Sequence, residues 1–135
     1  MGEKEIMGCK GAFSIRIDDI MLDCDDAVRL GEFYAGLLGW TCTKFNDDCV
    51  MVKAEDHPVR LLCQREEGYV PPVWPEQEGA QQKMLHLDFT VDNLENAVAQ
   101  AVHLGAKIAE TQYNPRQWTT MLDPAGHPFC LCLPE

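Results

Sequence analysis

The amino-acid sequence predicts an α+β fold in which two βαβββ modules form a cupped, mostly antiparallel, eight-stranded sheet with the helices outside. A pattern of apolar strand, acidic turn, amphipathic helix and Leu-Gly stop occurs twice, starting near Ile20 and near Leu85. Each copy is followed by three short strand-like runs between turn residues. A length of 135 residues suits one domain with a real core. We therefore expect a single domain over 1–135, with modules at about 14–66 and 83–134 and a crossover linker at 67–82.

The first copy begins with a strand at 20–24 that runs into two acidic residues. Asp25 or Asp26 can cap the free amides at the start of a helix. Apolar residues, Phe33 among them, then recur at helical spacing. Gly39 supplies the left-handed residue that ends the helix.

The second copy has the same order of signals. A strand at 85–91 is followed by Asp92 and Asn93, either of which can cap a helix. An apolar stripe at helical spacing follows, and Gly105 ends it. The remaining strands are predicted at 41–45, 50–54 and 59–64 in the first module and at 107–110, 117–122 and 128–133 in the second.

Charge and composition exclude several classes of protein. The net charge is −11, with eleven Lys and Arg scattered among 22 acidic residues, which argues against binding to nucleic acid or to an anionic membrane. The N-terminus is polar and lacks an apolar signal core, and no apolar run approaches the length of a membrane span. These features predict a cytoplasmic protein.

Seven cysteines are present, and the sequence contains no Cys-x-x-Cys pair. An odd number of cysteines without an export signal indicates reduced, mostly buried thiols. Cys130 and Cys132 alternate on a strand and therefore share one face, so they either pack as small apolar side chains or bind a metal together.

Strand alternation predicts which side chains face the inside of the cup. Leu85, Leu87 and Phe89 are expected to face the helix, which turns His86 and Asp88 inward. Asp19, Met21 and Asp23 are inward on the first strand, opposite Arg60, Leu62 and Gln64. The predicted ligand-binding residues are His86, Asp88, Asp19, Arg60, Gln64, Trp74, Trp118 and Cys130.

Several of these residues have two possible roles. Asp19 with Arg60 is a salt bridge that is structural or orients a ligand, or it takes part in catalysis. His86 lines a binding pocket or is a structural histidine. Trp118 belongs to the core or to the pocket wall. His57 and His127 lie beside prolines in turns and are expected at the surface.

The linker is rich in Pro, Gly, Gln and Glu, with Tyr69 and Trp74 embedded in it. Aromatic side chains in a polar segment need a surface to lie on. They lie either across the mouth of the cup or over the outside of the core.

Four stretches together resemble the glyoxalase-like proteins of the vicinal-oxygen-chelate superfamily, over roughly residues 14–134. They are Glu32-Phe33-Tyr34 with Leu37-Leu38-Gly39-Trp40, then Leu85-His86-Leu87-Asp88, then Leu104-Gly105-Ala106, then Asp123-Pro124-Ala125-Gly126-His127-Pro128-Phe129-Cys130. The resemblance implies a cup that often holds a divalent metal, with ligands on the first and last strand of each module. These positions fall at Asp19, His86, Arg60 and Cys130.

Arginine cannot ligate a metal, because it has no acceptor and a permanent positive charge. We therefore expect no resident metal and no other cofactor, with a divalent metal as the alternative. The resemblance implies a small-molecule-binding protein or a lyase or isomerase of unknown substrate. The alternatives are a non-catalytic protein that sequesters a drug or metabolite, as in bleomycin resistance, and a metal-dependent glyoxalase or dioxygenase. The resemblance also implies a homodimer.

Overall fold

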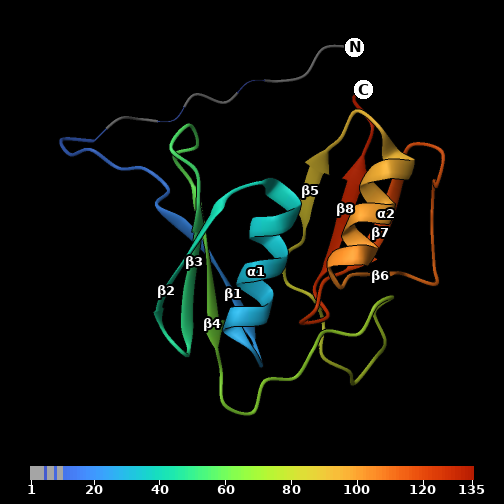
Figure 1. The fold of residues 1–135 in the computed structure, drawn as a ribbon, viewed down its shortest axis with the longest axis horizontal. Helices are drawn as coiled ribbons and strands as arrows, with labels where there is room; N and C mark the ends of the chain where they lie inside the picture. The colour runs from blue at the N-terminus through green and yellow to red at the C-terminus, as the bar shows by residue number, and fades with distance from the viewer. Residues whose placement is uncertain (1–4, 6–7, 9–10) are drawn as a thin grey trace.

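The computed structural model describes residues 5, 8 and 11–135, so Cys9 lies outside the described residues. The two-module order is confirmed, and each module is a strand, a helix and three strands (Figure 1). The first module contains β1 (Asp19–Cys24), α1 (Ala27–Leu38), β2 (Thr41–Asn46), β3 (Cys49–Lys53) and β4 (Arg60–Arg65). The second contains β5 (Leu87–Thr90), α2 (Leu94–Leu104), β6 (Lys107–Ile108), β7 (Trp118–Leu122) and β8 (Pro128–Cys132).

Each module forms its own four-stranded sheet, and the two sheets have equivalent topology. The strand orders are β1-β4-β3-β2 and β5-β8-β7-β6. In each sheet the first strand pairs in parallel with the last, and the other pairs are antiparallel. The parallel pair follows from the helix, which carries the chain across the sheet before it returns.

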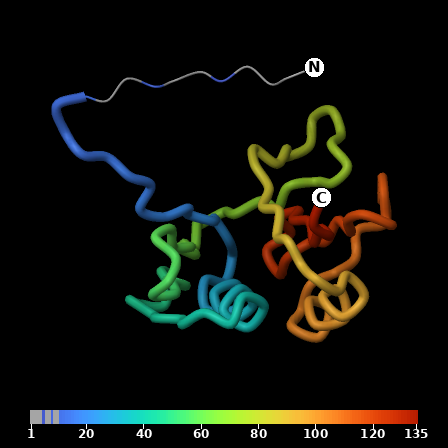
Figure 2. The backbone as a smooth tube through the Cα atoms, turned by 90° about the horizontal axis from the view of Figure 1, so that it is seen from above, coloured from blue at the N-terminus to red at the C-terminus, as the bar shows by residue number. Residues whose placement is uncertain are grey.

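Both helices lie on one side of the molecule, and the linker lies on the opposite side (Figure 2). The sequence leaves two possible helix caps in each module, and the structure shows which residue is used. Asp26 accepts a hydrogen bond from the amide of Arg29, and Asn93 accepts one from the amide of Asn96. The predicted stops are confirmed, since Gly39 and Gly105 both adopt the left-handed conformation.

The hydrophobic core joins the two modules. Phe33 and Tyr34 of α1 pack against Phe129 of β8, and Tyr34 also packs against Phe89 of β5, with ring centroids 5.8–6.2 Å apart. Phe33, Tyr34 and Phe129 are almost completely buried. Aromatic pairs at these distances stabilise the fold beyond the area they bury. The first helix is therefore shared between the modules, which fixes the position of one module against the other.

Strand alternation in β1 is as predicted. Leu22 and Cys24 are buried toward α1, whereas Met21 and Asp23 are exposed on the other face. β5 starts two residues later than predicted, at Leu87. Leu85, which was expected to face the helix, lies before the strand and is exposed, so this part of the prediction is wrong.

The predicted strand at 107–110 is shorter because a side chain replaces part of it. The Gln112 amide nitrogen donates to the carbonyls of Ala109 and Thr120, and the Thr120 amide donates to the Gln112 side-chain oxygen at 2.9 Å. The Gln112 side chain therefore makes hydrogen bonds to the backbone of β7 that a longer β6 would otherwise make.

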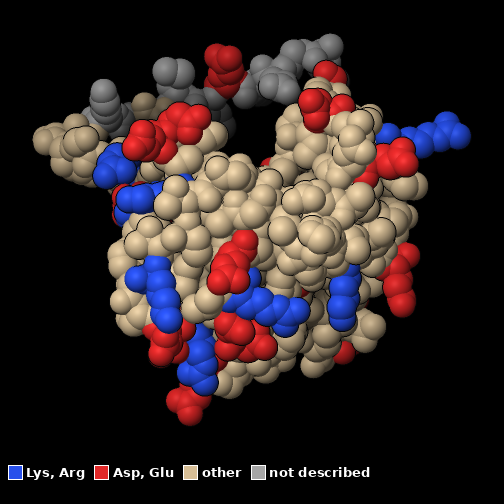
Figure 3. All heavy atoms as spheres, in the orientation of Figure 1, with Lys and Arg blue, Asp and Glu red and all other residues tan. Residues whose placement is uncertain are grey.

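Among the described residues, no helix has the length and apolar character needed to cross a membrane. On the face shown in Figure 3, basic side chains are interspersed with acidic ones and do not form a continuous basic surface.

Candidate functional site

A cavity of about 380 Å³ lies at the junction of the two modules. Its wall combines the end of β1, both ends of the linker, the residues that enter β5 and the turn before β8. Met21 and Asp23 come from β1, Tyr69 from the linker, and His86 and His127 from the second module. The volume is at the lower end of the range for small-molecule sites, which typically combine an apolar wall with a few polar groups.

The turn before β8 is held by a buried carboxylate, Asp123. Tyr34 donates a hydrogen bond to Asp123 Oδ2 at 2.6 Å, and the amides of Ala125 and His127 donate to Oδ1 at 2.9 and 3.0 Å. Burial raises the pKa of Asp123 and raises the pKa of Tyr34 well above its ordinary value. The phenol therefore stays protonated and acts as a donor. This network fixes the turn that carries His127 to the cavity.

His127 lies in the turn before β8, as predicted, and its half-buried ring forms part of the cavity wall. Its Nε2 atom donates to the backbone carbonyl of Asp23 at 2.6 Å. The Tyr69 hydroxyl donates to the carbonyl of Ala125 at 2.7 Å and lies 3.3 Å from the same Nε2 atom. His57, the equivalent residue in the first module, is exposed and lies against Trp40 with ring centroids 5.0 Å apart.

Tyr69 and His127 were not among the predicted binding residues. The signal available in the sequence was the Asp-Pro-x-Gly-His-Pro turn, whose glycine permits a close approach of the linker. A Cβ atom at Gly126 would lie 2.9 Å from Pro71 Cβ, so the turn and the linker are in direct contact. The contact brings together segments more than 50 residues apart, which local patterns do not reveal.

Of the eight predicted binding residues, His86 lines the cavity and the other seven do not. Asp19 and Arg60 are register partners on β1 and β4, as are Asp23 and Gln64. Trp118 is the register partner of Cys132. Trp74 packs against Tyr113 and under the Lys83 ammonium, which lies 5.0 Å from the ring centroid.

His86, Asp88 and Cys130 are brought together on the face of the second sheet that points away from α2. His86 Nε2 lies 3.3 Å from Asp88 Oδ1, and one potential ligand atom from each of the three residues lies within 4.8 Å of the others. Burial raises the pKa of the Cys130 thiol. A neutral thiol beside a carboxylate and an imidazole makes a compact polar cluster at the edge of the cavity.

The residues at the four family ligand positions do not fit a metal shared by both modules. Arg60 occupies one position, and its Nη2 atom lies 2.5 Å from Asp18 Oδ2 and 3.7 Å from Asp19 Oδ2. Its Nη1 atom donates to Met51 Sδ at 3.4 Å. The Arg60 guanidinium thus pairs with the Asp19 carboxylate, which would be the metal ligand of the first strand, and its positive charge would repel a cation there. The Asp19–Arg60 contact is an ion pair.

Two βαβββ modules, with both helices on one side and a cavity at their junction, define the architecture of the glyoxalase, bleomycin-resistance and dioxygenase superfamily. The profile of the glyoxalase-like domain family matches residues 19–132 of the sequence. This chain belongs to that family. None of the curated proteins matches its sequence.

Solved structures share the fold at low sequence identity. A glyoxalase-related enzyme from Fulvimarina pelagi superposes with a TM-score of 0.65 at 15% identity, over 88% of each chain. A glyoxalase family protein from Enterococcus faecalis gives 0.61 at 20% identity, over 87% of this chain and 96% of the other. An antibiotic-binding protein from a Streptomyces species gives 0.59 at 15% identity, over 93% of this chain and the whole of the other.

Proposed function

We propose that this protein binds a small organic molecule in the cavity between its modules. The observation that carries the proposal is the enclosure of one space by β1, the linker and the second module, with two imidazoles in its wall. Tyr69, Met21 and Val70 supply aromatic and aliphatic surface, and His86 and His127 supply hydrogen-bonding groups. The wall also carries charged residues, Asp23, Glu66, Glu67 and Lys83, and such a mixture of apolar and polar groups suits an amphipathic ligand.

The enzymatic form of the proposal is a lyase or isomerase reaction. Such reactions need a group that accepts a proton and a group that returns it. His86 lines the cavity with its Nε2 atom 3.3 Å from Asp88 Oδ1, whereas the Nε2 proton of His127 is already donated to the carbonyl of Asp23. His86 is therefore the acid–base group of the proposed reaction, and His127 orients the ligand.

The second candidate function is sequestration without chemistry. It is favoured by the Arg60 ion pair, which removes the two-module chelate on which metal-dependent glyoxalases and dioxygenases of this superfamily rely. It is also favoured by the shared fold of an antibiotic-binding protein. The two candidates use the same cavity and differ only in the fate of the ligand.

The test is a thermal-shift screen of small organic molecules, repeated with EDTA and with added divalent ions. A compound that binds the folded state raises the midpoint by mass action, by an amount that grows with its concentration. Hits are then incubated with the protein and analysed by mass spectrometry. A converted compound supports the lyase or isomerase, and a compound recovered unchanged supports sequestration.

His86→Ala provides the decisive variant, since His86 lies at the cavity and is partly exposed. We expect it to weaken ligand binding at least about tenfold while changing the midpoint of the unliganded protein little. His103→Ala, on the exposed surface of α2, is the matched control and retains full affinity. A large loss of stability in His86→Ala with unchanged affinity would contradict the pocket role.

We further propose a homodimer in the reducing cytoplasm. The dimer is supported by exposed apolar side chains in residues 11–18, before β1. The location is supported by six free cysteines among the described residues, two of which, Cys24 and Cys63, are fully buried.

A further inference from the structure

We propose that the ligand of the cavity between the modules is an organic cation, an amphipathic molecule that carries a protonated amine or a quaternary ammonium group. This inference rests on the proposed function, because it names the class of molecule that the same cavity takes. Its basis is a set of three carboxylates in the cavity wall, Asp23, Glu66 and Glu67, together with the aromatic ring of Tyr69.

The fold gathers the three carboxylates at one end of the first sheet. β1 and β4 are parallel neighbours, so their carboxyl ends lie at the same edge of the sheet, where Asp23 is the register partner of Gln64. The Glu66 amide continues this pairing by donating to the carbonyl of Cys24 at 2.9 Å. Asp23 therefore reaches the cavity from the end of one strand, and Glu66 and Glu67 reach it from the segment that leaves the neighbouring strand.

A tight turn adds Tyr69 to this end of the cavity. The Tyr69 amide donates to the carbonyl of Glu66 at 3.2 Å, and Gly68 has the positive φ, 75°, that closes the turn. Burial raises the pKa of the Tyr69 phenol, and the nearby carboxylates of Asp123 and Asp23 raise it further. The ring is therefore neutral and lies in a region of negative potential. The face of a tyrosine ring attracts a cation.

The basic side chain in the wall is engaged outside the cavity. Lys83 is the one Lys or Arg in the described part of the wall. Its ammonium lies 2.7 Å from Glu76 Oε1 and 5.0 Å from the centroid of the Trp74 ring, and neither of these residues lines the cavity. The positive charge of Lys83 is therefore balanced by Glu76 rather than by the carboxylates of the wall.

The three carboxylates are left without a basic partner. Within residues 11–135, no ion pair includes Asp23, Glu66 or Glu67. Arg65 is next to Glu66 in the sequence, but its guanidinium lies 4.0 Å from Asp48. Charges of one sign that line a concave wall concentrate the electric field and attract the opposite charge. The cavity therefore favours a cation and disfavours a carboxylate or phosphate ligand.

The apolar part of the wall indicates that the cation has an apolar body. Met21, Val70 and Leu85 line the same cavity as the carboxylates. An inorganic cation would leave this surface in contact with water, whereas an aryl or alkyl amine would cover it and bury its own apolar surface. The combination of carboxylates, an aromatic ring and aliphatic side chains thus fits an amphipathic amine.

Ligands that differ only in charge test the proposal. The panel contains phenylbutyl, naphthylethyl and octyl chains, each as the primary amine, the alcohol and the carboxylate, measured by thermal shift and titration calorimetry in EDTA. The amines should bind at least about tenfold more tightly than the matching alcohols, and the carboxylates least tightly. The advantage of the amines should shrink between about 0.01 M and about 1 M salt, because the Debye length falls from about 30 Å to about 3 Å.

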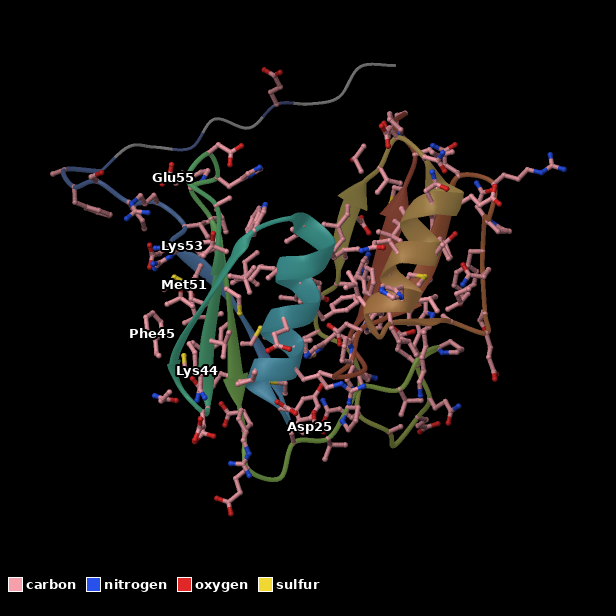
Figure 4. The ribbon with its side chains drawn as sticks, in the orientation of Figure 1. Asp25, Lys44, Phe45, Met51, Lys53 and Glu55 are labelled. Atoms are coloured by element: carbon pink, nitrogen blue, oxygen red, sulfur yellow. The ribbon has the colours of Figure 1, made fainter. Side chains whose placement is uncertain are left out.

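A double variant and a matched control locate the effect. Glu66→Gln with Glu67→Gln changes two exposed side chains and should weaken amine binding at least about tenfold while alcohol binding is unchanged. Glu55→Gln with Asp56→Asn removes the same charge from another exposed turn, and Glu55 lies at the opposite end of the first sheet from Asp25 (Figure 4). This control should keep the preference for amines, and circular dichroism verifies that both variants are folded.

Amines that bind no more tightly than the matching alcohols would overturn the proposal. A loss of amine affinity in the control as large as that in the Glu66 and Glu67 variant would also overturn it. Alcohols or carboxylates that bind the wild type and lose affinity in His86→Ala would leave the proposed function standing while the preference for a cation is rejected. If no compound of any charge binds, the proposed function and the cationic ligand both fail.

Discussion

Among single residues, Tyr34 and Asp123 make the polar contact that matters most for the shape of the site. The phenol and the carboxylate are both buried and are 2.6 Å apart, and they link α1 to the turn that carries His127. The aromatic ring of Tyr34 also packs on Phe89 and Phe129. One side chain thus supports both the core between the modules and the cavity wall.

Replacing Tyr34 with Phe keeps the ring and removes the donor to Asp123. Because Asp123 Oδ2 is then buried without this partner, we expect the free energy of unfolding to fall by about 1–3 kcal/mol. Urea denaturation measures the change. Tyr69→Phe is the comparison, since its hydroxyl is only partly buried and bonds to one carbonyl. A loss in Tyr34→Phe no larger than that in Tyr69→Phe would show that the buried contact carries no special weight.

The cysteines should differ sharply in reactivity. Burial raises the pKa of Cys24 to about 11, and Cys24 and Cys63 have no accessible surface, whereas Cys42 is exposed. Because the thiolate is the reactive form, alkylation at pH 8 should label Cys42 first and leave Cys24 and Cys63 intact. In urea all three should react. Peptide mass spectrometry gives the order, and early labelling of Cys24 in the native protein would contradict the packing of β1 against α1.

At the level of elements, the helices and strands follow from local signals. Asp26 and Asn93 cap the helices, Gly39 and Gly105 end them, and alternation in β1 separates Leu22 from Met21. These features depend on neighbours a few residues away, so the sequence could predict them. The adjacency of Asp19 and Arg60 was also predictable, because both strands have a clear alternating pattern.

The candidate site was less predictable because it depends on contacts across the whole chain. Tyr69 and Ala125 are 56 residues apart, and His127 and Asp23 are 104 residues apart. Periodicity describes one element at a time and does not place a linker against a turn. His127 resembled His57 in its setting beside a proline, yet only His127 has a buried carboxylate holding its turn in place.

Two glycines with positive φ, Gly39 at the end of α1 and Gly126 in the turn before β8, should differ in their tolerance of alanine. Gly39 has φ of 70° and open space around its Cα, so Gly39→Ala should cost about 1 kcal/mol from backbone conformation alone. Gly126 has φ of 89°, and an added Cβ would also lie 2.9 Å from Pro71 Cβ. Gly126→Ala should therefore cost clearly more and weaken ligand binding in the cavity. Urea denaturation and ligand titration measure both effects, and equal losses in the two variants would argue against the contact between turn and linker.

At the scale of the whole molecule, residues 11–18 form an extended arm before β1 that lies away from the body (Figure 2). Phe13, Ile15 and Ile17 alternate along it and are 69%, 83% and 67% exposed. Alternation with this period is typical of a strand with one apolar face. The first sheet also carries exposed apolar side chains, and Phe45 projects from β2 away from α1 (Figure 4).

Apolar side chains of this number are seldom left in water, so we expect the arm to be covered by a second copy of the chain. Light scattering after size-exclusion chromatography should give the mass of a dimer at micromolar concentrations. The triple variant Phe13→Ser, Ile15→Ser, Ile17→Ser should raise the dimer dissociation constant at least about tenfold, because each buried aliphatic or aromatic side chain contributes roughly 1.5–3 kcal/mol. Val102→Ser, an exposed apolar position on α2, should leave the constant unchanged. A monomeric wild type, or a triple variant that dimerises as well as the wild type, would mean that the arm does not hold two chains together.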